Sequence, residues 1–242
     1  MPVQENSPGA ERRDKVRGMI RTLALLACLA LAACGESPIA NAPADAGAAA
    51  SSADTVAPAP LTERMRVRLE TDAGPILLEL NGRRAPITTA NFLAYVDQGK
   101  FDGVTFYRAS RTPRRTGQGF IQGGIRRSPM LGLPPIEHEP TGRTGLRHVD
   151  GTISMARREP GSAMGDFFIV AGAMPSMDQG NRRPSSGNDD DQGYAAFGRV
   201  VEGMDVVRRI LAGTTVENAG AGAMRGQMLE RPIRIVRAVR AD

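Results

Sequence analysis

Short stretches in which apolar and polar residues alternate recur along the chain from residue 63 onward. The first two stretches have their apolar positions at Val67, Leu69, Ile76, Leu78 and Leu80. A period of two residues is typical of a half-buried β-strand. The residues between them, Asp-Ala-Gly-Pro at 72–75, favour a tight turn, so this part of the pattern predicts a β-hairpin.

The remaining pattern predicts further strands and two helices. Strand-like stretches lie around Val104 and Phe106, and at 119–124, 151–157, 167–170, 194–200 and 232–239. The first helix is expected to begin at Pro86 or Thr88 and to end before Gly99, and the second to span 202–211. Many strands without βαβ alternation predict a mainly β fold, an antiparallel barrel whose closure removes exposed edges.

Each predicted helix has one apolar face. In the first helix this face holds Ile87, Ala90, Phe92, Leu93 and Val96, and in the second Met204, Val207, Ile210 and Leu211. Helical spacing of apolar residues predicts that the face packs on the sheet. We expect the first helix to plug one end of the barrel. On the strand at 167–170, Phe167 and Phe168 point to opposite faces, so one belongs to the core and the other can face a groove.

The N-terminus has the features of a targeting segment. Basic residues from Arg12 to Arg21 precede a short apolar stretch at 23–30, and Leu-Ala-Ala-Cys follows at 31–34. Small residues before a cysteine resemble a bacterial lipobox, which makes residues 1–33 a lipoprotein-type signal peptide and Cys34 the lipidated residue. An ordinary secretory signal cleaved near Ala33 is the alternative. Met19 is a second possible start of the chain.

A segment rich in Ala, Pro, Ser and Gly follows the signal. It covers residues 34–62, lacks apolar periodicity, and is expected to be a flexible tether. The folded domain is then predicted at 63–242. The only cysteines, Cys28 and Cys34, lie before it, so the domain has neither a disulfide nor a cysteine metal site.

Charge and the remaining polar residues exclude several classes of function. The formal net charge is +5 and the basic residues are dispersed among acids, so we expect no nucleic-acid partner. His138 and His148 are expected to be isolated, and the acidic residues 189–191 to form a solvated loop tip, so we expect no metal. Ser154 and Ser162 lack the Gly-x-Ser-x-Gly context of a hydrolase.

Six short motifs occur in a fixed order along the domain. They are Pro-x-Thr-x-x-Asn-Phe at 86–92, Phe-x-Arg at 106–108, Phe-x-Gln-Gly-Gly at 120–124, Gly-Thr-x-Ser-Met-Ala at 151–156, Gly-x-Phe-Phe-Ile at 165–169 and Phe-Gly-x-Val at 197–200. Together, over residues 67–239, they resemble a cyclophilin-type peptidyl-prolyl cis–trans isomerase. The resemblance implies a closed eight-stranded antiparallel β-barrel capped by two α-helices, working without a cofactor.

The resemblance also implies roles for eight residues. Arg108 is the catalytic residue, and the substrate-binding residues are Phe120, Gln122, Ala156, Arg157, Phe168, Met177 and Tyr194. Rotation about a peptide bond to proline has a barrier of about 18–20 kcal/mol. Because no bond is made or broken, stabilising the twisted amide is sufficient, and an arginine that hydrogen-bonds the proline nitrogen can do so. Only the backbone of Arg157 is expected to act.

Several positions depart from the family pattern. Gly119 stands where the family usually has a pocket phenylalanine, and Phe120 where it usually has methionine. Tyr107 replaces a common histidine, and Asp166 replaces a glutamine. The loop at 111–117 is longer than usual and rich in arginine.

Two functions follow as expectations. The first is an isomerase that assists the folding of periplasmic or outer-membrane proteins. It would be a monomer that binds proline-containing clients and is held by a lipid on Cys34 at the periplasmic side of the bacterial envelope, as an outer-membrane lipoprotein. The alternative is a proline-binding chaperone or scaffold module of the envelope with little or no catalytic activity.

Overall fold

The computed structural model describes residues 64–126, 128, 130–181 and 190–241. All of them belong to one compact unit, Val56–Asp242. The predicted signal peptide, Cys34 and the predicted tether lie outside the described residues, so they and the predicted domain boundaries stay predictions. Within the described ranges, no helix is both long and apolar enough to cross a membrane.

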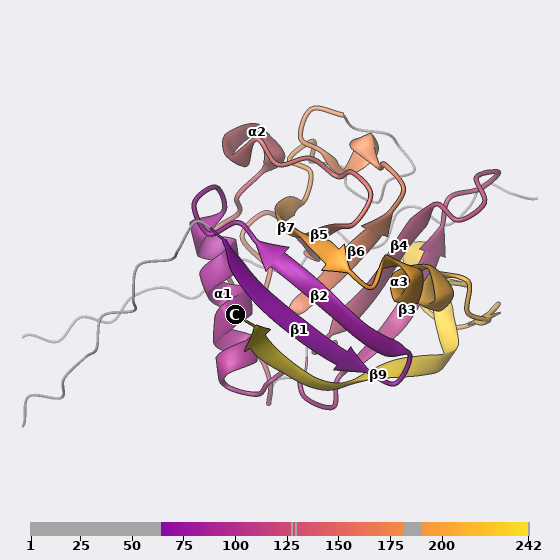
Figure 1. The fold of residues 1–242 in the computed structure, drawn as a ribbon. Coiled ribbons are helices and arrows are strands. Elements are labelled where there is room, and N and C mark those ends of the chain that lie inside the picture. The colour runs from indigo at the N-terminus through magenta and orange to yellow at the C-terminus, as the bar shows by residue number, and fades with distance from the viewer. Residues whose placement is uncertain (1–63, 127, 129, 182–189, 242) are drawn as a thin grey trace, which may run out of the picture. The chain divides into compact units, whose positions relative to one another are not determined.

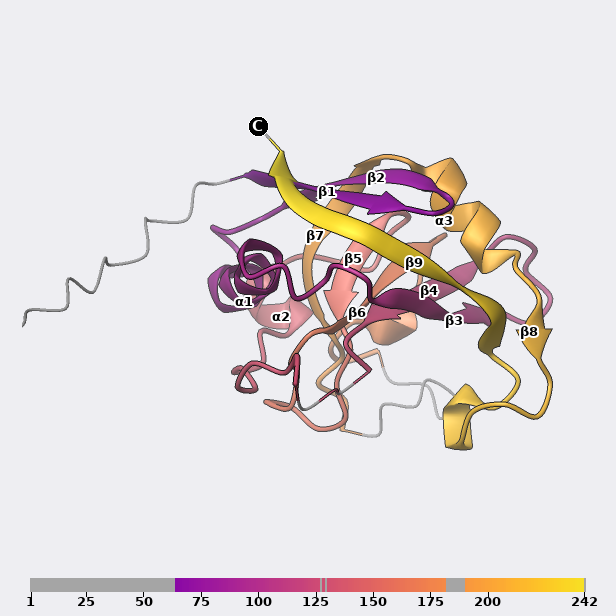
Figure 2. The same cartoon turned by 90° about the horizontal axis from the view of Figure 1, so that it is seen from below.

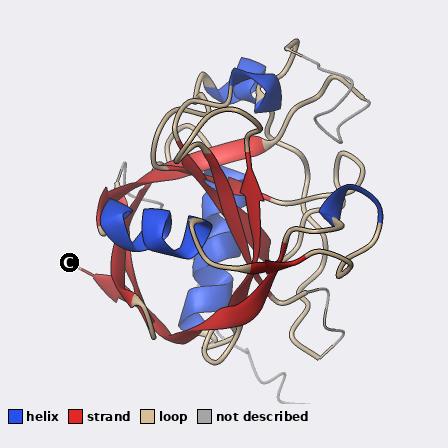
Figure 3. Ribbon diagram, turned by 90° about the vertical axis from the view of Figure 1, so that its right-hand side faces the viewer, coloured by secondary structure: helices blue, strands red, loops and turns tan. Residues whose placement is uncertain are grey.

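One antiparallel sheet closes on itself to form the barrel (Figure 1). Its strands are β1 (Met65–Thr71), β2 (Gly74–Leu80), β3 (Thr105–Arg111), β4 (Gly119–Gly124), β5 (Thr152–Met155), β6 (Asp166–Ala171), β7 (Ala195–Glu202) and β9 (Met228–Ala241). The order is β1-β2-β7-β5-β6-β4-β3-β9, and β9 pairs back with β1. The two-residue strand β8 (Thr215–Val216) adds to β9 outside the ring. This arrangement confirms the predicted eight-stranded barrel, and Figure 3 shows the strands curving around its interior.

Helices cover the barrel on two sides. Helix α1 (Pro86–Asp97) packs against β7 and β9, and α3 (Met204–Leu211) against β2, β3, β4 and β6. The two helices lie at opposite sides of the domain in Figures 1 and 2. The sequence missed the short helix α2 (Thr141–Thr144) and two single turns, η1 (Pro175–Met177) and η2 (Gly222–Met224), which are too short to produce a periodic pattern.

A distant carboxylate caps the start of α1. The helix has no side-chain cap of its own, and its first turn carries no acidic residue. Instead, the buried Glu139 accepts hydrogen bonds from the backbone N–H of Ile87 and Thr88, at 3.3 and 2.7 Å, and from the Thr88 hydroxyl. A negative charge at a helix N-terminus also interacts favourably with the helix dipole. The contact fixes the long loop after β4 to the helix.

Two loops, the one that carries Glu139 and the one between β5 and β6, change which residues of α1 are buried. Ala90 is exposed and Ile87 only half-buried, so the predicted apolar face is wrong at these two positions. Asn91 and Tyr95 are buried instead, because Asn91 donates to the carbonyl of Met164 and the Tyr95 hydroxyl accepts from the N–H of Leu133. In α3, Val206 is buried and Met204 is only half-buried, and the helix begins two residues later than expected.

Two apolar clusters divide the domain. The large one fills the barrel, where the Phe92 ring lies 4.9 to 5.3 Å from the rings of Phe101, Phe167 and Phe197. Burying each such side chain contributes about 1.5–3 kcal/mol. The small cluster contains Phe168 and lies on the opposite face of β4 and β6. Phe167 and Phe168 therefore face opposite sides of the sheet, as predicted, and the second side is the one that can hold a ligand.

Candidate functional site

A β-bulge in β3 brings two consecutive side chains to one face of the sheet. The register against β4 shifts between Phe106 and Arg108. Phe106 and Ala109 both point into the core, whereas Tyr107 and Arg108 both line a surface cavity of about 780 Å³. A regular strand would alternate these four residues, and the extra residue of a bulge is what re-aims a side chain. The bulge also places Arg108 directly opposite Gln122 on β4.

The Arg108 guanidinium is held from two sides. Its Nη1 donates to Oε1 of Gln122 at 2.8 Å. Its Nε and Nη2 donate to Oε1 of Gln227, at 2.9 and 2.8 Å, and Nη2 also donates to the carbonyl of Ala223 at 3.4 Å. Gln227 is itself fixed by a hydrogen bond from its Nε2 to the same carbonyl. The arginine is therefore preorganised before any ligand arrives.

This arrangement leaves one donor of Arg108 available. Arginine has five N–H bonds, and four are matched by the acceptors just described. The remaining N–H is on Nη1 and has no acceptor among the described residues. The guanidinium carbon lies 4.9 Å from the centre of the Phe120 ring, so this donor is next to an apolar wall. Burial lowers the pKa of Arg108, whose hydrogen-bond partners among the described residues are all neutral.

Two departures from the family pattern form a single hydrogen-bond chain. Gln122 donates from Nε2 to the Tyr107 hydroxyl at 2.8 Å, and that hydroxyl donates to Oδ1 of Asp166 at 3.2 Å. Burial, and then the charge of Asp166, raises the pKa of Tyr107 well above its usual value. The phenol thus stays protonated and acts as donor and acceptor at once. The chain fixes the Gln122 amide so that its oxygen faces Arg108.

The apolar wall of the cavity is built on β4 and β6. The Phe120 and Phe168 rings are 5.3 Å apart, and Tyr194 meets Phe168 edge-on at 5.3 Å. Val170 and Met177 complete the small cluster. Gly119 contributes no side chain, and a Cβ there would collide with the carbonyl oxygen of Ser110. Phe120 alone therefore supplies the aromatic ring from this end of β4.

A buried polar triad lies behind Phe168. His148 Nδ1 is 2.7 Å from Oδ1 of Asp178, its Nε2 is 3.0 Å from the Ser154 hydroxyl, and its ring stacks on Phe168 at 5.9 Å. The expectation that His148 is isolated was wrong, since Ser154 and the more distant Asp178 both contact its ring. Ser154 has no exposed surface, so the triad cannot reach a substrate as a hydrolase would require. It supports the ring that forms the floor of the cavity.

A salt bridge fixes the segment that carries Tyr194. The Arg157 side chain is almost fully buried and donates to both carboxylate oxygens of Asp190, at 2.7 and 2.9 Å, and to the carbonyl of Gly193. It also lies 5.3 Å from the centre of the Tyr194 ring. The side chain of Arg157, expected to be passive, therefore has a structural role, and Asp190 is an anchored residue instead of part of a solvated tip.

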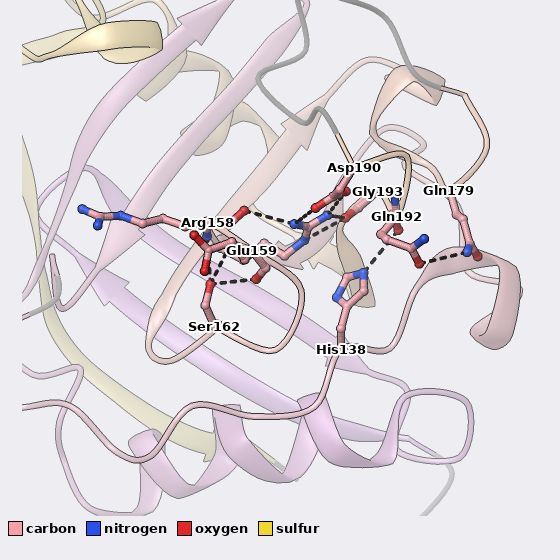
Figure 4. Close-up of polar contacts among 9 residues, drawn as sticks. His138, Arg158, Glu159, Ser162, Gln179, Asp190, Gln192 and Gly193 are labelled. Carbon is pink, nitrogen blue, oxygen red and sulfur yellow. Dashed lines mark hydrogen bonds and ion pairs between the residues drawn. The ribbon is translucent and has the colours of Figure 1, made fainter. Parts of the chain in front are cut away.

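Figure 4 shows how the same segment is held on its other side. His138 lies beside Gln192, with its Nε2 3.2 Å from the Gln192 carbonyl, so this histidine is not isolated either. Desolvation lowers the pKa of His138. Gln179 donates to the Gln192 side chain at 3.3 Å. Among the described residues, no group of three or more His, Cys, Asp or Glu side chains is placed to hold a metal ion.

The structure brings all eight candidate site residues of the domain to one cavity. Its lining includes Arg108, Phe120, Gln122, Ala156, Arg157, Phe168, Met177 and Tyr194. These residues come from several strands and the loops between them, so the closed barrel is what assembles them. One side offers a fixed cationic donor and an amide, and the other an apolar wall. Such a surface can bind a small apolar ring while hydrogen-bonding the chain around it.

Comparison with known proteins identifies the family. The sequence profile of the family described as cyclophilin type peptidyl-prolyl cis-trans isomerase matches residues 66–239. This chain belongs to the cyclophilin-type isomerases. A peptidyl-prolyl isomerase of Streptomyces antibioticus is 39% identical over 155 residues, covering 64% of this chain and 87% of that protein. Isomerase A of Dickeya dadantii is 39% identical over 164 residues, covering 66% and 77%.

Solved structures agree on the fold. A cyclophilin-type isomerase of Cryptosporidium parvum superposes with a TM-score of 0.54 at 20% identity, covering 74% of this chain and 98% of that one. The enzyme class of this chain is therefore that of a peptidyl-prolyl cis–trans isomerase, and cyclophilins bind proline-containing peptides. The roles of individual residues in this cyclophilin's cavity stay predictions.

The motifs did not reveal every residue that shapes the cyclophilin site. Gln227, Ala223 and Asp178 lie outside the motifs, and each contributes a contact described above. Gln227 is 119 residues from Arg108 in sequence, and only the pairing of β3 with β9 brings the two together. The sequence did contain a sign of the contact between Tyr107 and Asp166. Both depart from the family pattern, and a double departure can indicate a compensating contact.

Proposed function

We propose that Arg108 accelerates isomerisation by donating its available Nη1 hydrogen bond to the proline nitrogen as the amide twists. Twisting breaks amide resonance and localises a lone pair on that nitrogen. A donor that is already oriented stabilises this state without reorganising. The observation that carries the proposal is the set of hydrogen bonds made by the Arg108 guanidinium. Four of its five N–H groups donate to Gln122, Gln227 and Ala223, so the direction of the fifth is fixed.

The neighbouring residues hold the rest of the substrate. In this proposal the proline ring packs against Phe120, Phe168 and Met177, which form one apolar cluster. Gln122 and the backbone of Arg157 bind the chain on either side, and Ala156 and Tyr194 border the ring. The apolar wall excludes water from the proline nitrogen, which strengthens a charged hydrogen bond to it.

A coupled proteolysis assay on a proline peptide tests the catalytic role. Wild type is compared with Arg108→Ala, and with Arg68→Ala as a control on the exposed outer face of β1. Removing a preorganised donor is expected to lower kcat/KM about 100-fold or more. Arg68→Ala should match wild type. Equal, slow rates for wild type and Arg108→Ala would instead indicate a proline-binding chaperone or scaffold module.

We further propose that the protein assists the folding of periplasmic and outer-membrane proteins while anchored by a lipid on Cys34. The support is the sequence Leu-Ala-Ala-Cys at 31–34 after a basic and an apolar stretch, followed by residues 34–62, whose composition suits a tether. Metabolic labelling with palmitate tests the anchor. Label is expected on wild type and not on Cys34→Ala, and an unlabelled wild type would contradict the proposal.

A further inference from the structure

The cavity carries an excess of positive charge. Five arginines line it, namely Arg108, Arg111, Arg126, Arg157 and Arg158, whereas Asp166 is the only carboxylate among the described lining residues. Asp190 lies behind the lining and neutralises Arg157. Subtracting Asp166 and Asp190 from the five arginines leaves an excess of three positive charges within the described part of the site.

Most of these charges are held without a carboxylate. Arg108 is bound by two glutamines and a carbonyl, all neutral. Arg111 donates to the carbonyls of Leu211 and Gly213, at the end of α3. Asp166 is buried and already accepts from Tyr107 and from the backbone N–H of Arg126. The described residues therefore supply few counter-charges to this cavity.

Arg126 and Arg158 are the two arginines best placed to receive an outside anion. The Arg126 guanidinium lies over the Tyr107 ring at 5.1 Å, and its side chain makes no hydrogen bond or ion pair with the described residues. Arg158 is exposed, and Figure 4 shows its side chain pointing away from Asp190 and the contacts around it. Its neighbour Glu159 is not part of the cavity lining.

Elsewhere on the domain, arginines commonly have acidic partners. Ion pairs are formed by Arg66, Arg143, Arg147, Arg199, Arg208, Arg209, Arg234 and Arg240. Several other arginines outside the cavity, Arg68, Arg84 and Arg237 among them, have no acidic partner among the described residues, so a lack of ion pairs is not confined to the cavity. What distinguishes the cavity is that four arginines without an acidic partner among the described residues line the same hollow.

We propose that the groove selects polypeptide segments with an aspartate or glutamate within a few residues of the proline, recognised by Arg126 and Arg158. Arg158 directly follows Arg157, whose backbone is proposed to hold the substrate chain, so a residue near the proline passes close to it. Arg126 lies over Tyr107, next to Arg108. This inference rests on the proposed isomerase function and names its substrate class.

The expected effect of the arginines is electrostatic attraction of acidic peptide segments to the cavity. Like charges lining one cleft raise the local concentration of oppositely charged ligands and speed their association. Each exposed guanidinium–carboxylate pair contributes little, so two of them are expected to change kcat/KM by about fivefold. Salt at about 1 M shortens the Debye length to about 3 Å and removes most of this preference.

The test compares three peptides in the isomerisation assay with the full chain. They differ at one residue two positions before proline, which is Glu, its neutral isostere Gln, or Lys. At low salt we expect kcat/KM to be highest for the Glu peptide, about fivefold above Gln, and lowest for Lys. In the double variant Arg126→Gln, Arg158→Gln the Glu-to-Gln ratio should approach one. The double variant Arg126→Lys, Arg158→Lys keeps the charge and should keep most of the ratio.

Arg68→Gln, on the outer face of β1, serves as the matched control and should retain the wild-type ratio. Equal rates for the Glu and Gln peptides with wild type would overturn the substrate preference while leaving the isomerase function intact. A Glu-to-Gln ratio that survives in both double variants would likewise overturn the roles of Arg126 and Arg158. If wild type isomerises none of the peptides, the proposed function fails and this inference fails with it.

Discussion

Gln227 accepts two hydrogen bonds from Arg108 on a single oxygen, at 2.9 Å from Nε and 2.8 Å from Nη2. The contact comes from the segment that leads into the last strand of the barrel and holds the side of the guanidinium that faces away from Gln122. Its consequence is geometric, because it decides which N–H of Arg108 remains for the substrate. A residue with no expected role in the site thus positions the residue proposed to be catalytic.

Replacing Gln227 tests this positioning role. Gln227→Met keeps the length of the side chain and removes the acceptor oxygen, so Arg108 loses two of its four internal hydrogen bonds. Each such bond to a charged group contributes about 1.5–3 kcal/mol. Because the arginine keeps Gln122, we expect kcat/KM to fall about tenfold with little change in KM. Gln98→Met, at the exposed end of α1, should have no effect, and an unchanged kcat in Gln227→Met would contradict the role.

Tyr107→Phe tests the hydrogen-bond chain behind Gln122. The variant leaves Gln122 Nε2 without its acceptor and removes one donor from Asp166. An unsatisfied buried group costs about 1–3 kcal/mol, and we expect a loss of that size in the free energy of unfolding. Denaturant titration measures it. Loss of the orienting contact should also lower kcat, whereas wild-type stability and activity together would show that the chain is dispensable.

The pKa of Tyr107 gives a separate prediction at high pH. Burial raises this pKa above the usual 10.0, so the folded protein keeps a proton that the unfolded chain releases as the pH passes 10. The contribution of Tyr107 to the free energy of unfolding is therefore fully present below pH 10 and is lost as the pH rises above it. Tyr95 and Tyr194 have raised pKa values too, so all three tyrosines contribute to the fall in the free energy of unfolding as the pH rises. Stability measured from about pH 9 to about pH 11 should fall less steeply in Tyr107→Phe than in wild type, and equal slopes would contradict this.

Asp190→Asn tests the salt bridge that anchors Tyr194. The change leaves the buried Arg157 guanidinium with a neutral partner, and we expect the free energy of unfolding to drop by about 2 kcal/mol. The hydrogen bond from Arg157 lowers the pKa of Asp190. The contribution of Asp190 to the free energy of unfolding is therefore present above its usual pKa of 3.8 and is lost as the pH falls below that value. The exposed neighbour offers a matched control, since Asp191→Asn should leave stability unchanged. Equal effects of the two variants would show that the bridge does not hold this segment.

The sequence predicted the strands and the lining residues of the site better than the hydrogen bonds that hold those residues in place. Alternation along the chain predicted the strands and the opposite orientations of Phe167 and Phe168, because burial on one face imposes a period of two. The closed eight-stranded form of the barrel was implied by the family resemblance. Motifs brought Arg108 and Gln122 forward as a pair, and the β3–β4 register places them opposite each other.

The missed contacts have a common cause. Glu139 at α1, Gln227 at Arg108, and Asp178 at His148 all join residues far apart in the chain. Local periodicity contains no information about such pairs. Helix α1 shows the same limit, since its buried residues Asn91 and Tyr95 are explained only by the two loops that contact them.

Arg108 is proposed to act on the twisted amide and not on binding alone. Exchange NMR on a proline peptide measures both quantities in one sample, because the peptide's cis and trans signals report the catalysed exchange rate and its bound shifts report affinity. For Arg108→Ala we predict an exchange rate at saturating enzyme at least about 100-fold below wild type, with peptide affinity changed by no more than a few-fold. An Arg108→Ala protein that still exchanges the bound peptide at the wild-type rate would contradict a catalytic role for Arg108.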